Sequence, residues 1–313
     1  METILRRYGI LTLCLGLLTG LPAVADDGSP NSAAEAVSAK AISAHEAEIT
    51  DWRQRRHERL ASDSGWLSLA GLEWLQQGEN RVGRGDGFDI QIQGGPADWG
   101  TITVTGEELI YAPATGADVT IDGLPASPTR LVPDVEGPPT VIRSGNLSMY
   151  AILRGSYALR IKDTRAPTLL AFTGIDNYPI DASWRFDARF TPAEPGRTMA
   201  IANVLGQSEN MPVIGFVEFE RDGRKYRLLG LAEKGVDSLW FLFADRTSGR
   251  ETYGAGRFLY SDGMPENGRV VVDFNKAYNP PCAFNDYSTC PLPPQQNRLD
   301  LAVTAGEKNF HHD

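Results

Sequence analysis

Two charged residues interrupt otherwise apolar, strand-like runs near the end of the chain, Arg257 in GRFLY and Asp273 in VVVDFN. The alternation of a strand places Asp273 and Asn275 on the same face. If residues 255–261 and 269–275 pair as antiparallel strands, Arg257 lies beside Asp273 or Asn275. Because a charge in an apolar strand requires a partner, the sequence predicts a charged pair. In this pair Arg257 holds an anion, and Asp273 accepts hydrogen bonds or acts as acid or base.

The loop that follows, residues 276–298, collects polar and aromatic side chains between prolines that fix its backbone. These side chains extend the predicted ligand-binding site, whose members are Arg257, Asp273, Asn275, Tyr278, Asn279 and Arg298. The alternative is structural: the pair of Arg257 and Asp273 ties the loop to the sheet, and the asparagines cap its turns.

Residues for covalent or metal-assisted catalysis are sparse. The four histidines stand at 45, 57, 311 and 312, so a Ser-His-Asp triad requires that His57 folds back onto the site. There is no G-x-S-x-G motif, no catalytic residue is assigned, and neither a cofactor nor a metal is expected. The sequence favours a binding module for a small polar or anionic ligand. Two alternatives stay open: a hydrolase-like enzyme with an Asp/Arg/Tyr site, and a structural partner of another envelope protein.

The first residues have the layout of a secretory signal peptide. Arg6 and Arg7 precede an apolar run over residues 8–21, and the small residues Ala23 and Ala25 follow it. Cleavage after Ala25 is expected, and the apolar run is shorter than the ~20 residues of a spanning helix. We therefore expect a periplasmic or secreted protein with no integral membrane segment after cleavage.

Two cysteines, Cys282 and Cys290, remain after this cleavage. In an oxidising compartment, cysteines so close in sequence most simply form a disulfide. Closing so short a loop stabilises the fold by about 2.5 kcal/mol. A zinc site is the alternative, although no histidine lies inside the loop to complete it.

The net charge of −10 argues against a nucleic-acid partner, because no excess of positive charge is available to replace phosphate counterions. A small-molecule ligand is compatible with this charge. The sequence identifies no protein partner.

Short strands dominate the rest of the chain. The abundance of Gly and Pro (32 and 20) favours many short turns. Ile102 and Val104 alternate with threonines at the period of a half-buried strand, and Asp222-Gly223 is the preferred dipeptide of a tight hairpin. The predicted class is therefore all-β, with one short N-terminal helix. The predicted segments are a signal peptide (1–25), a linker (26–45), a helix (46–64), an N-terminal β-sandwich-like unit (65–165) and a C-terminal β-barrel or sandwich with a Pro/Cys-rich loop (166–313).

The predicted helix places Ile49, Trp52, Arg56 and Leu60 on one face. It also carries a run of arginines, for which a solvated helix face is expected and an anion-binding patch is the alternative. These arginines are Arg53, Arg55, Arg56 and Arg59.

Four stretches resemble the bacterial and archaeal proteins grouped as domain of unknown function family 1684: GWLSLAGLEWL, MPVIGFVEFERDGRKYRL, LWFLFADRTSGRETYGAGRFLY and VVVDFNKAYNPPCAFNDYSTCPLPPQQNRL. The resemblance covers roughly residues 50–310 and implies no particular activity or site residue.

Residues 78–124 are also similar to the opening strands of forkhead-associated domains, β-sandwiches that bind phosphothreonine peptides. Arg84 matches the arginine after the first strand of that family. The serine and asparagine that hold the phosphate there have no counterpart in PADWG at residues 96–100. The similarity therefore implies a sandwich fold and not phosphopeptide binding.

Overall fold

The computed structural model describes residues 30–311, with side chains from Lys40 onward. The predicted signal peptide lies outside these residues. The chain divides after Ser43, and residues 44–313 form the compact unit that contains the sheets. Among the described residues, no helix combines the length and the apolar character that crossing a bilayer requires.

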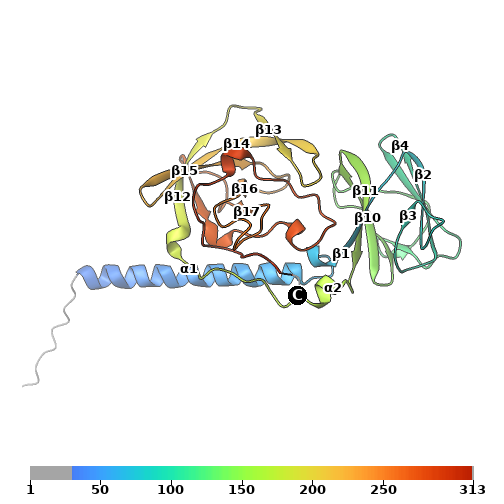
Figure 1. The fold of residues 1–313 in the computed structure, drawn as a ribbon, viewed down its shortest axis with the longest axis horizontal. Helices are drawn as coiled ribbons and strands as arrows, with labels where there is room; N and C mark the ends of the chain where they lie inside the picture. The colour runs from blue at the N-terminus through green and yellow to red at the C-terminus, as the bar shows by residue number, and fades with distance from the viewer. Residues whose placement is uncertain (1–29, 312–313) are drawn as a thin grey trace, which may run out of the picture. The chain divides into compact units, whose positions relative to one another are not determined.

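One long helix, α1 (Pro30–Leu60), precedes the sheets (Figure 1). It begins well before the predicted helix at 46–64, so the segment predicted as a linker is helical from Pro30 onward. The reason is composition: this segment is rich in alanine, the strongest helix former, and has no glycine after Gly28.

The second half of α1 buries the face that the sequence predicts. Ile49, Arg56 and Leu60 are buried, and Trp52 is half-buried. A short second helix, α2 (Pro167–Leu170), lies between the N-terminal and C-terminal sheets in the sequence.

The N-terminal sheets form a sandwich around one apolar core, as predicted. Alternate residues of β4 point into this core, since Ile102 and Val104 are buried whereas Thr103 and Thr105 are exposed. The larger sheet has the order β1-β11-β10-β9-β6-β7, and the smaller has the order β3-β2-β4-β5-β8. The strands are β1 (Leu69–Trp74), β2 (Gly78–Gly83), β3 (Ile90–Gln91), β4 (Asp98–Thr105), β5 (Glu108–Pro113), β6 (Thr120–Ile121), β7 (Leu124–Pro125), β8 (Thr129–Arg130), β9 (Ile142–Ser144), β10 (Leu147–Arg154) and β11 (Ser156–Asp163).

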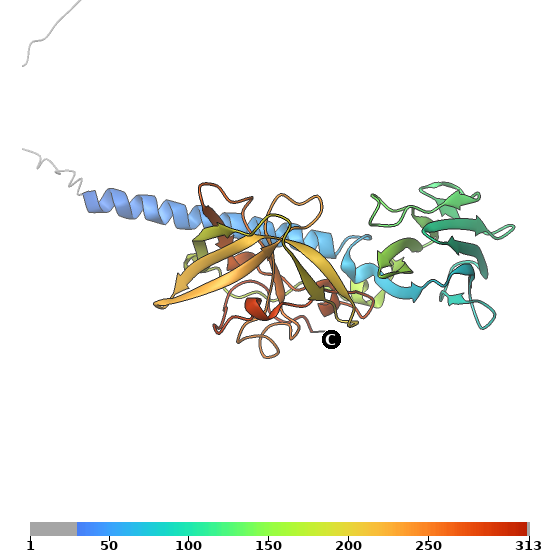
Figure 2. The same cartoon turned by 90° about the horizontal axis from the view of Figure 1, so that it is seen from above.

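A seven-stranded sheet forms the C-terminal unit, in the order β17-β16-β15-β14-β12-β18 with β13 attached to β14. It curves into a half-barrel around a second apolar core, and Figure 2 shows the long, twisted strands of this sheet. The predicted hairpin is confirmed: Asp222 and Gly223 both have positive φ, as a type I′ turn requires, and Arg221 pairs with Arg224. The strands are β12 (Arg185–Pro192), β13 (Thr198–Ala202), β14 (Ser208–Arg221), β15 (Arg224–Leu231), β16 (Trp240–Phe243), β17 (Arg257–Tyr260) and β18 (Arg269–Asp273). The all-β class with one N-terminal helix is therefore confirmed.

Beyond β18 the described chain is irregular, with short 3-10 helices at Phe274–Lys276, Pro281–Ala283 and Gln295–Asn297. Cys282 and Cys290 form the predicted disulfide. Phe258 and Tyr278 exchange two main-chain hydrogen bonds, of 2.8 and 2.9 Å. The first turn of the loop therefore continues the sheet beyond β17.

Candidate functional site

Arg257, at the start of β17, is fully buried, with an exposed fraction of 0%. Its Nη2 donates to Asp245 Oδ2 and to the carbonyl of Val303, each at 2.9 Å. Its Nη1 donates to the carbonyl of Ala305 at 2.6 Å and to that of Glu307 at 3.2 Å. The charge and four hydrogen bonds of Arg257 therefore serve the fold.

The predicted pairing of Arg257 with Asp273 is wrong, because the strands that carry them are not neighbours. β17 pairs with β16, whereas β18 pairs with β12 at the other end of the strand order. Asp273 Oδ2 instead lies 2.6 Å from His45 Nε2. Asn275 donates to the other carboxylate oxygen through its main-chain N at 3.0 Å and its Nδ2 at 2.8 Å.

His45 is a residue that the sequence prediction missed, because the predicted helix began one residue later. It lies one helical turn before Ile49, on the face that α1 buries. The helical spacing of His45, Ile49 and Trp52 is therefore the signal that identifies it.

The buried asparagines of the loop bond to the main chain of distant segments. Asn275 bonds to both main-chain groups of Asp181, and Asn279 donates to the carbonyl of Lys308 at 2.7 Å. Asn297, which lies outside the six predicted site residues, bonds to three main-chain groups of β15 and β16. These amides satisfy backbone groups that the irregular segments leave without ladder partners.

Tyr278 packs among aromatic rings, with ring centroids 6.4 Å from Trp66 and 6.1 Å from Tyr260. Burial raises the pKa of Tyr278 above the ordinary range of tyrosine, so its hydroxyl stays protonated. Arg298 is exposed, and its side chain forms no hydrogen bond or ion pair with the rest of the described chain. Of the six predicted site residues, the structure brings only Asp273 and Asn275 into side-chain contact.

Arg56 anchors α1 to the irregular C-terminal segments. Its guanidinium carbon lies 4.7 Å from the ring centroid of Trp66, 4.9 Å from that of Tyr278 and 5.6 Å from that of Phe284. Its Nε donates to Glu307 Oε1 at 2.9 Å. A buried guanidinium that packs on aromatic rings and also bonds to a carboxylate makes strong contacts that depend on its orientation.

The other arginines of α1 face different surroundings. Arg55 and Arg59 are exposed, and Arg55 pairs with Asp51 one turn away. Arg53 is half-buried and donates to the carbonyl of Tyr178 at 2.9 Å. The predicted solvated face therefore holds for two of the four arginines.

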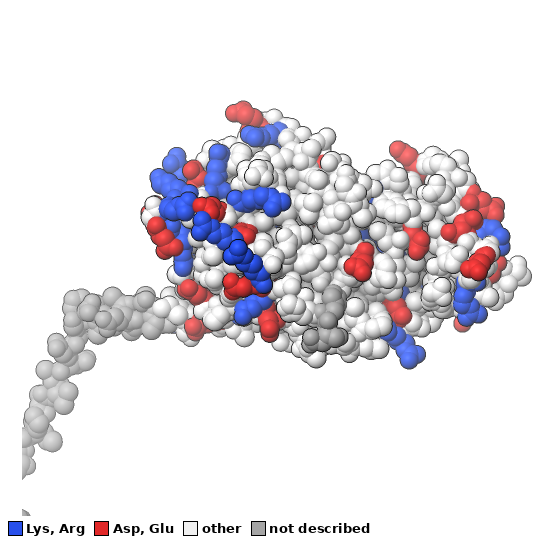
Figure 3. All heavy atoms as spheres, viewed as in Figure 1, with Lys and Arg blue, Asp and Glu red and all other residues white. Residues whose placement is uncertain are grey.

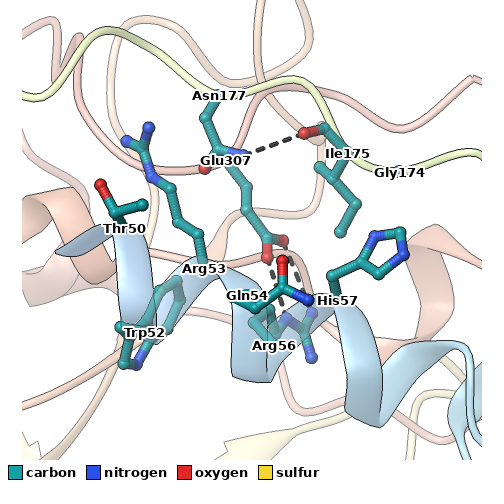
Figure 4. Close-up of a pocket in the computed structure, with 10 residues that line it drawn as sticks. All are labelled: Thr50, Trp52, Arg53, Gln54, Arg56, His57, Gly174, Ile175, Asn177 and Glu307. Atoms are coloured by element: carbon teal, nitrogen blue, oxygen red, sulfur yellow. Dashed lines mark hydrogen bonds and ion pairs between the residues drawn. The ribbon is translucent and has the colours of Figure 1, made fainter. Parts of the chain in front are cut away.

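A cavity of about 440 Å³ lies beside α1 (Figure 4). Its walls come from the helix, from the irregular segment at 174–177 and from the C-terminal Glu307. The lining residues are Thr50, Trp52, Arg53, Gln54, Arg56, His57, Gly174, Ile175, Asn177 and Glu307. None of the six predicted site residues lines this cavity.

Figure 4 shows Glu307 reaching toward Arg56 and the Asn177 amide donating to the Ile175 carbonyl. Two buried polar atoms of the lining, Arg53 Nε and Asn177 Oδ1, have no hydrogen-bond partner within residues 30–311. Burial lowers the pKa of Arg53, yet a guanidinium remains charged at neutral pH. The cavity wall therefore contains one cationic side chain and one amide whose buried polar atoms lack partners.

The ring of His57 also lines the cavity and stacks on Phe172, with centroids 4.9 Å apart. In the described part of the chain, no group of three or more histidine, cysteine, aspartate or glutamate residues is placed to hold a metal ion.

The structural role of Arg257 gives a direct prediction. Arg257→Ala leaves Asp245 as an unpaired buried charge, so the free energy of unfolding should fall by about 3–5 kcal/mol. The matched control is Arg298→Ala, an exposed arginine of the same predicted site, which should change it by less than about 0.5 kcal/mol. Urea denaturation of both variants is the measurement. Equal, small losses would contradict the role assigned to Arg257.

A family described as "Protein of unknown function (DUF1684)" matches residues 170–308, a shorter stretch than the resemblance at roughly 50–310. Among solved structures, the chain is similar to an uncharacterised protein of Haloarcula marismortui determined by NMR in solution. The identity is 30%, over 44% of this chain and 77% of that chain, with a TM-score of 0.38. No curated protein matches the chain. At residues 170–308, the chain therefore contains a domain of the DUF1684 family of proteins of unknown function.

Proposed function

We propose that this protein is an exported, non-catalytic binding module of the cell envelope. Its ligand is a small polar molecule with an acidic group, such as a sugar acid, which binds in the cavity beside α1. The cavity volume of about 440 Å³ lies within the range of small-molecule sites. The signal-peptide pattern at residues 1–25 supports export.

The observation that carries this proposal is the pair of buried, unpartnered polar atoms in the cavity wall. Buried polar groups in folded proteins almost always have hydrogen-bond partners. Arg53 Nε is a donor and Asn177 Oδ1 is an acceptor, and neither has a partner within the described residues. Both atoms are closed to solvent, so a ligand reaches them when the two side chains turn toward the cavity. A ligand with one anionic oxygen and one hydroxyl group would then complement both.

The charges of the cavity favour an anion over a cation. Glu307 is already engaged, since its Oε1 accepts from Arg56 at 2.9 Å and its Oε2 accepts from the main-chain N of Asn279 at 2.7 Å. Among residues 30–311, Arg53 donates only to a neutral carbonyl, that of Tyr178. One positive charge of the lining is therefore not balanced by a carboxylate contact.

Binding is favoured over catalysis because the lining lacks an activated nucleophile. The hydroxyl of Thr50 donates to the carbonyl of Glu46 at 2.7 Å, and His57 stacks on an aromatic ring without a carboxylate partner. A nucleophile requires an adjacent base that a third group orients.

A hydrolase-like enzyme is the second candidate, because His45 and Asp273 form a histidine–carboxylate pair of 2.6 Å. The other ring nitrogen, His45 Nδ1, is buried and has no partner in the described chain. Within residues 30–311, no serine, threonine or cysteine side chain forms a hydrogen bond with His45, so the pair lacks the nucleophile of a triad.

Export is tested by cell fractionation of a strain that expresses the full chain. The protein should be found outside the cytoplasm, and N-terminal sequencing should begin at Asp26, because the expected cleavage follows Ala25. A full-length protein that retains Met1 in the cytoplasm would contradict this location.

Ligand binding is tested by calorimetry with glucuronate and gluconate, and with glucose as the neutral match. The acids should bind and glucose should not, because only the acids carry the charge that complements Arg53. Arg53→Gln should weaken acid binding by about tenfold or more, the value of a charged hydrogen bond.

The matched control is Arg55→Gln, which removes the same charge from the exposed side of α1 and should leave the affinity unchanged. If both variants lost the same affinity, the loss would come from the lower net charge of the protein and not from a contact of Arg53 with the ligand. Absence of binding by either acid would overturn the sugar-acid class. Turnover in a hydrolase screen that Asp273→Asn abolishes would support the enzyme instead.

A further inference from the structure

A row of polar residues runs across the larger N-terminal sheet. Thr120 on β6 pairs with Arg143 on β9, which pairs with Ser148 on β10, which in turn pairs with Lys162 on β11. Residues that face each other directly across antiparallel strands point to the same side of the sheet. Thr120, Arg143, Ser148 and Lys162 therefore form one line on one face.

A second line lies next to the first, two residues along the strands, where Tyr150 pairs with Arg160. The opposite face of the same strands belongs to the sandwich core, since Met149 and Ile161 are buried in it. From here on, the name basic row covers five residues of these two lines: Arg143, Ser148 and Lys162 from the first line, and Tyr150 and Arg160 from the second.

The burial of the basic row is graded. Ser148, in the middle, is buried with an exposed fraction of 7%. Tyr150, Arg160 and Lys162 are half-buried, and Arg143 is exposed. The hydroxyl of Ser148 therefore lies at the base of longer, cationic side chains.

The charges of the basic row are not balanced. Some surface cations elsewhere are paired: Figure 3 shows Lys and Arg gathered over β12–β15 among acidic residues, and two of the pairs there are Arg269 with Asp187 and Arg224 with Asp300. By contrast, no cation of the basic row forms an ion pair with a described residue.

The basic row also has unused hydrogen-bond donors. Arg160 Nε is buried and has no partner in the described chain. Lys162 Nζ donates to the carbonyl of Ser64 and lies 5.6 Å from the ring centroid of Tyr150, but neither contact brings a negative charge. Burial removes part of the hydration of a cation, and this costs free energy unless an anion lies beside it.

The pKa of Lys162 is consistent with an unbalanced positive charge on this face. Burial, together with the charges of Arg160 and Arg143, lowers the pKa of Lys162 to about 8. The charged and titratable groups around the amine are thus Arg160 on its own strand, Tyr150 on β10 and Arg143 on β9. An anion on this face would relieve the repulsion.

We propose that the basic row is a binding site for a tetrahedral oxyanion, the sulfate or phosphate group of a small molecule. Neighbouring strands lie about 4.8 Å apart, so Arg143 and Lys162 flank Ser148 from both sides at roughly 10 Å from each other. Arg143 and Lys162 are long enough to reach an anion above Ser148 from either side once Lys162 Nζ leaves the carbonyl of Ser64, and Arg160 supplies further donors. This site is separate from the cavity beside α1 and needs no assumption about it.

Calorimetry with inorganic sulfate, at ionic strength held constant with chloride, tests the proposal. Sulfate should bind to the wild-type protein, and Lys162→Met should weaken binding by about tenfold or more. The matched control is Lys225→Met, an exposed lysine on β15, which should leave binding unchanged. Inorganic phosphate should bind as sulfate does. Comparing a sulfate ester with a phosphate ester of the same small molecule would then show which of the two groups the site prefers.

The pH dependence provides a second readout, one that loss of stability would not mimic. Lys162 is charged below its pKa of about 8 and loses its proton above it. Sulfate keeps its charge throughout this range, so its affinity should be constant below pH 8 and fall above it by up to about tenfold per pH unit. Lys162→Arg keeps the charge and should remove this fall.

Three outcomes overturn the proposal: no sulfate binding by the wild type, equal losses in Lys162→Met and Lys225→Met, or the same pH profile in wild type and Lys162→Arg. Arg53→Gln separates this site from the cavity beside α1. It should leave sulfate binding intact even if the sugar-acid proposal fails.

Discussion

The buried guanidinium of Arg257 is the contact on which the C-terminal half of the molecule depends. The described segment beyond residue 298 contains no strand, so its carbonyl groups lack ladder partners. Arg257 donates to three of them, at Val303, Ala305 and Glu307, while Asp245 balances its charge. A planar guanidinium with five donors suits this task, which a lysine with its three donors would not complete.

This constraint extends from the sheet to the cavity. By holding the main chain at Glu307, Arg257 places the Glu307 carboxylate where it accepts from Arg56 and from the main-chain N of Asn279. Arg56 in turn fixes α1 among the rings of Trp66 and Tyr278. The position of the helix, and hence the shape of the cavity beside it, follows from a chain of buried polar contacts that begins at β17.

The loop after β18 uses its polar residues in the same way. Asn275, Asn279 and Asn297 are each fully buried and bond to main-chain groups of other segments. A buried backbone group without a partner costs about as much as a lost hydrogen bond, so an irregular buried loop requires such side chains. A cluster of Asn, Arg and Asp beside prolines is therefore as typical of a long buried loop as it is of a ligand site.

Local patterns in the sequence predicted local structure well. The alternation of Ile102 and Val104, the turn at Asp222-Gly223 and the disulfide of Cys282 and Cys290 are all found in the structure. Each of these signals depends on residues that are close in sequence. The start of α1 at Pro30 is not evident from the sequence, because a small, polar, alanine-rich segment is also typical of a linker.

Contacts between distant segments could not be predicted in this way. The sequence indicated that Arg257 needs a partner, but strand alternation specifies the face of a residue and not which strand lies beside it. The true partner, Asp245, lies outside any strand, and the pair of His45 and Asp273 joins residues 228 positions apart. The cavity depends on such contacts, because Arg56 and Glu307 are 251 positions apart.

A double-mutant cycle between Arg257 and Asp245 tests most directly the claim that the charged residues of the predicted site serve the fold. The variants Arg257→Met, Asp245→Asn and their combination are compared by urea denaturation, with a second cycle between Arg257→Met and Asp273→Asn. We expect a coupling energy of about 1–3 kcal/mol in the first cycle and below about 0.5 kcal/mol in the second. Additive effects in the first cycle, or a strong coupling between Arg257 and Asp273, would contradict it.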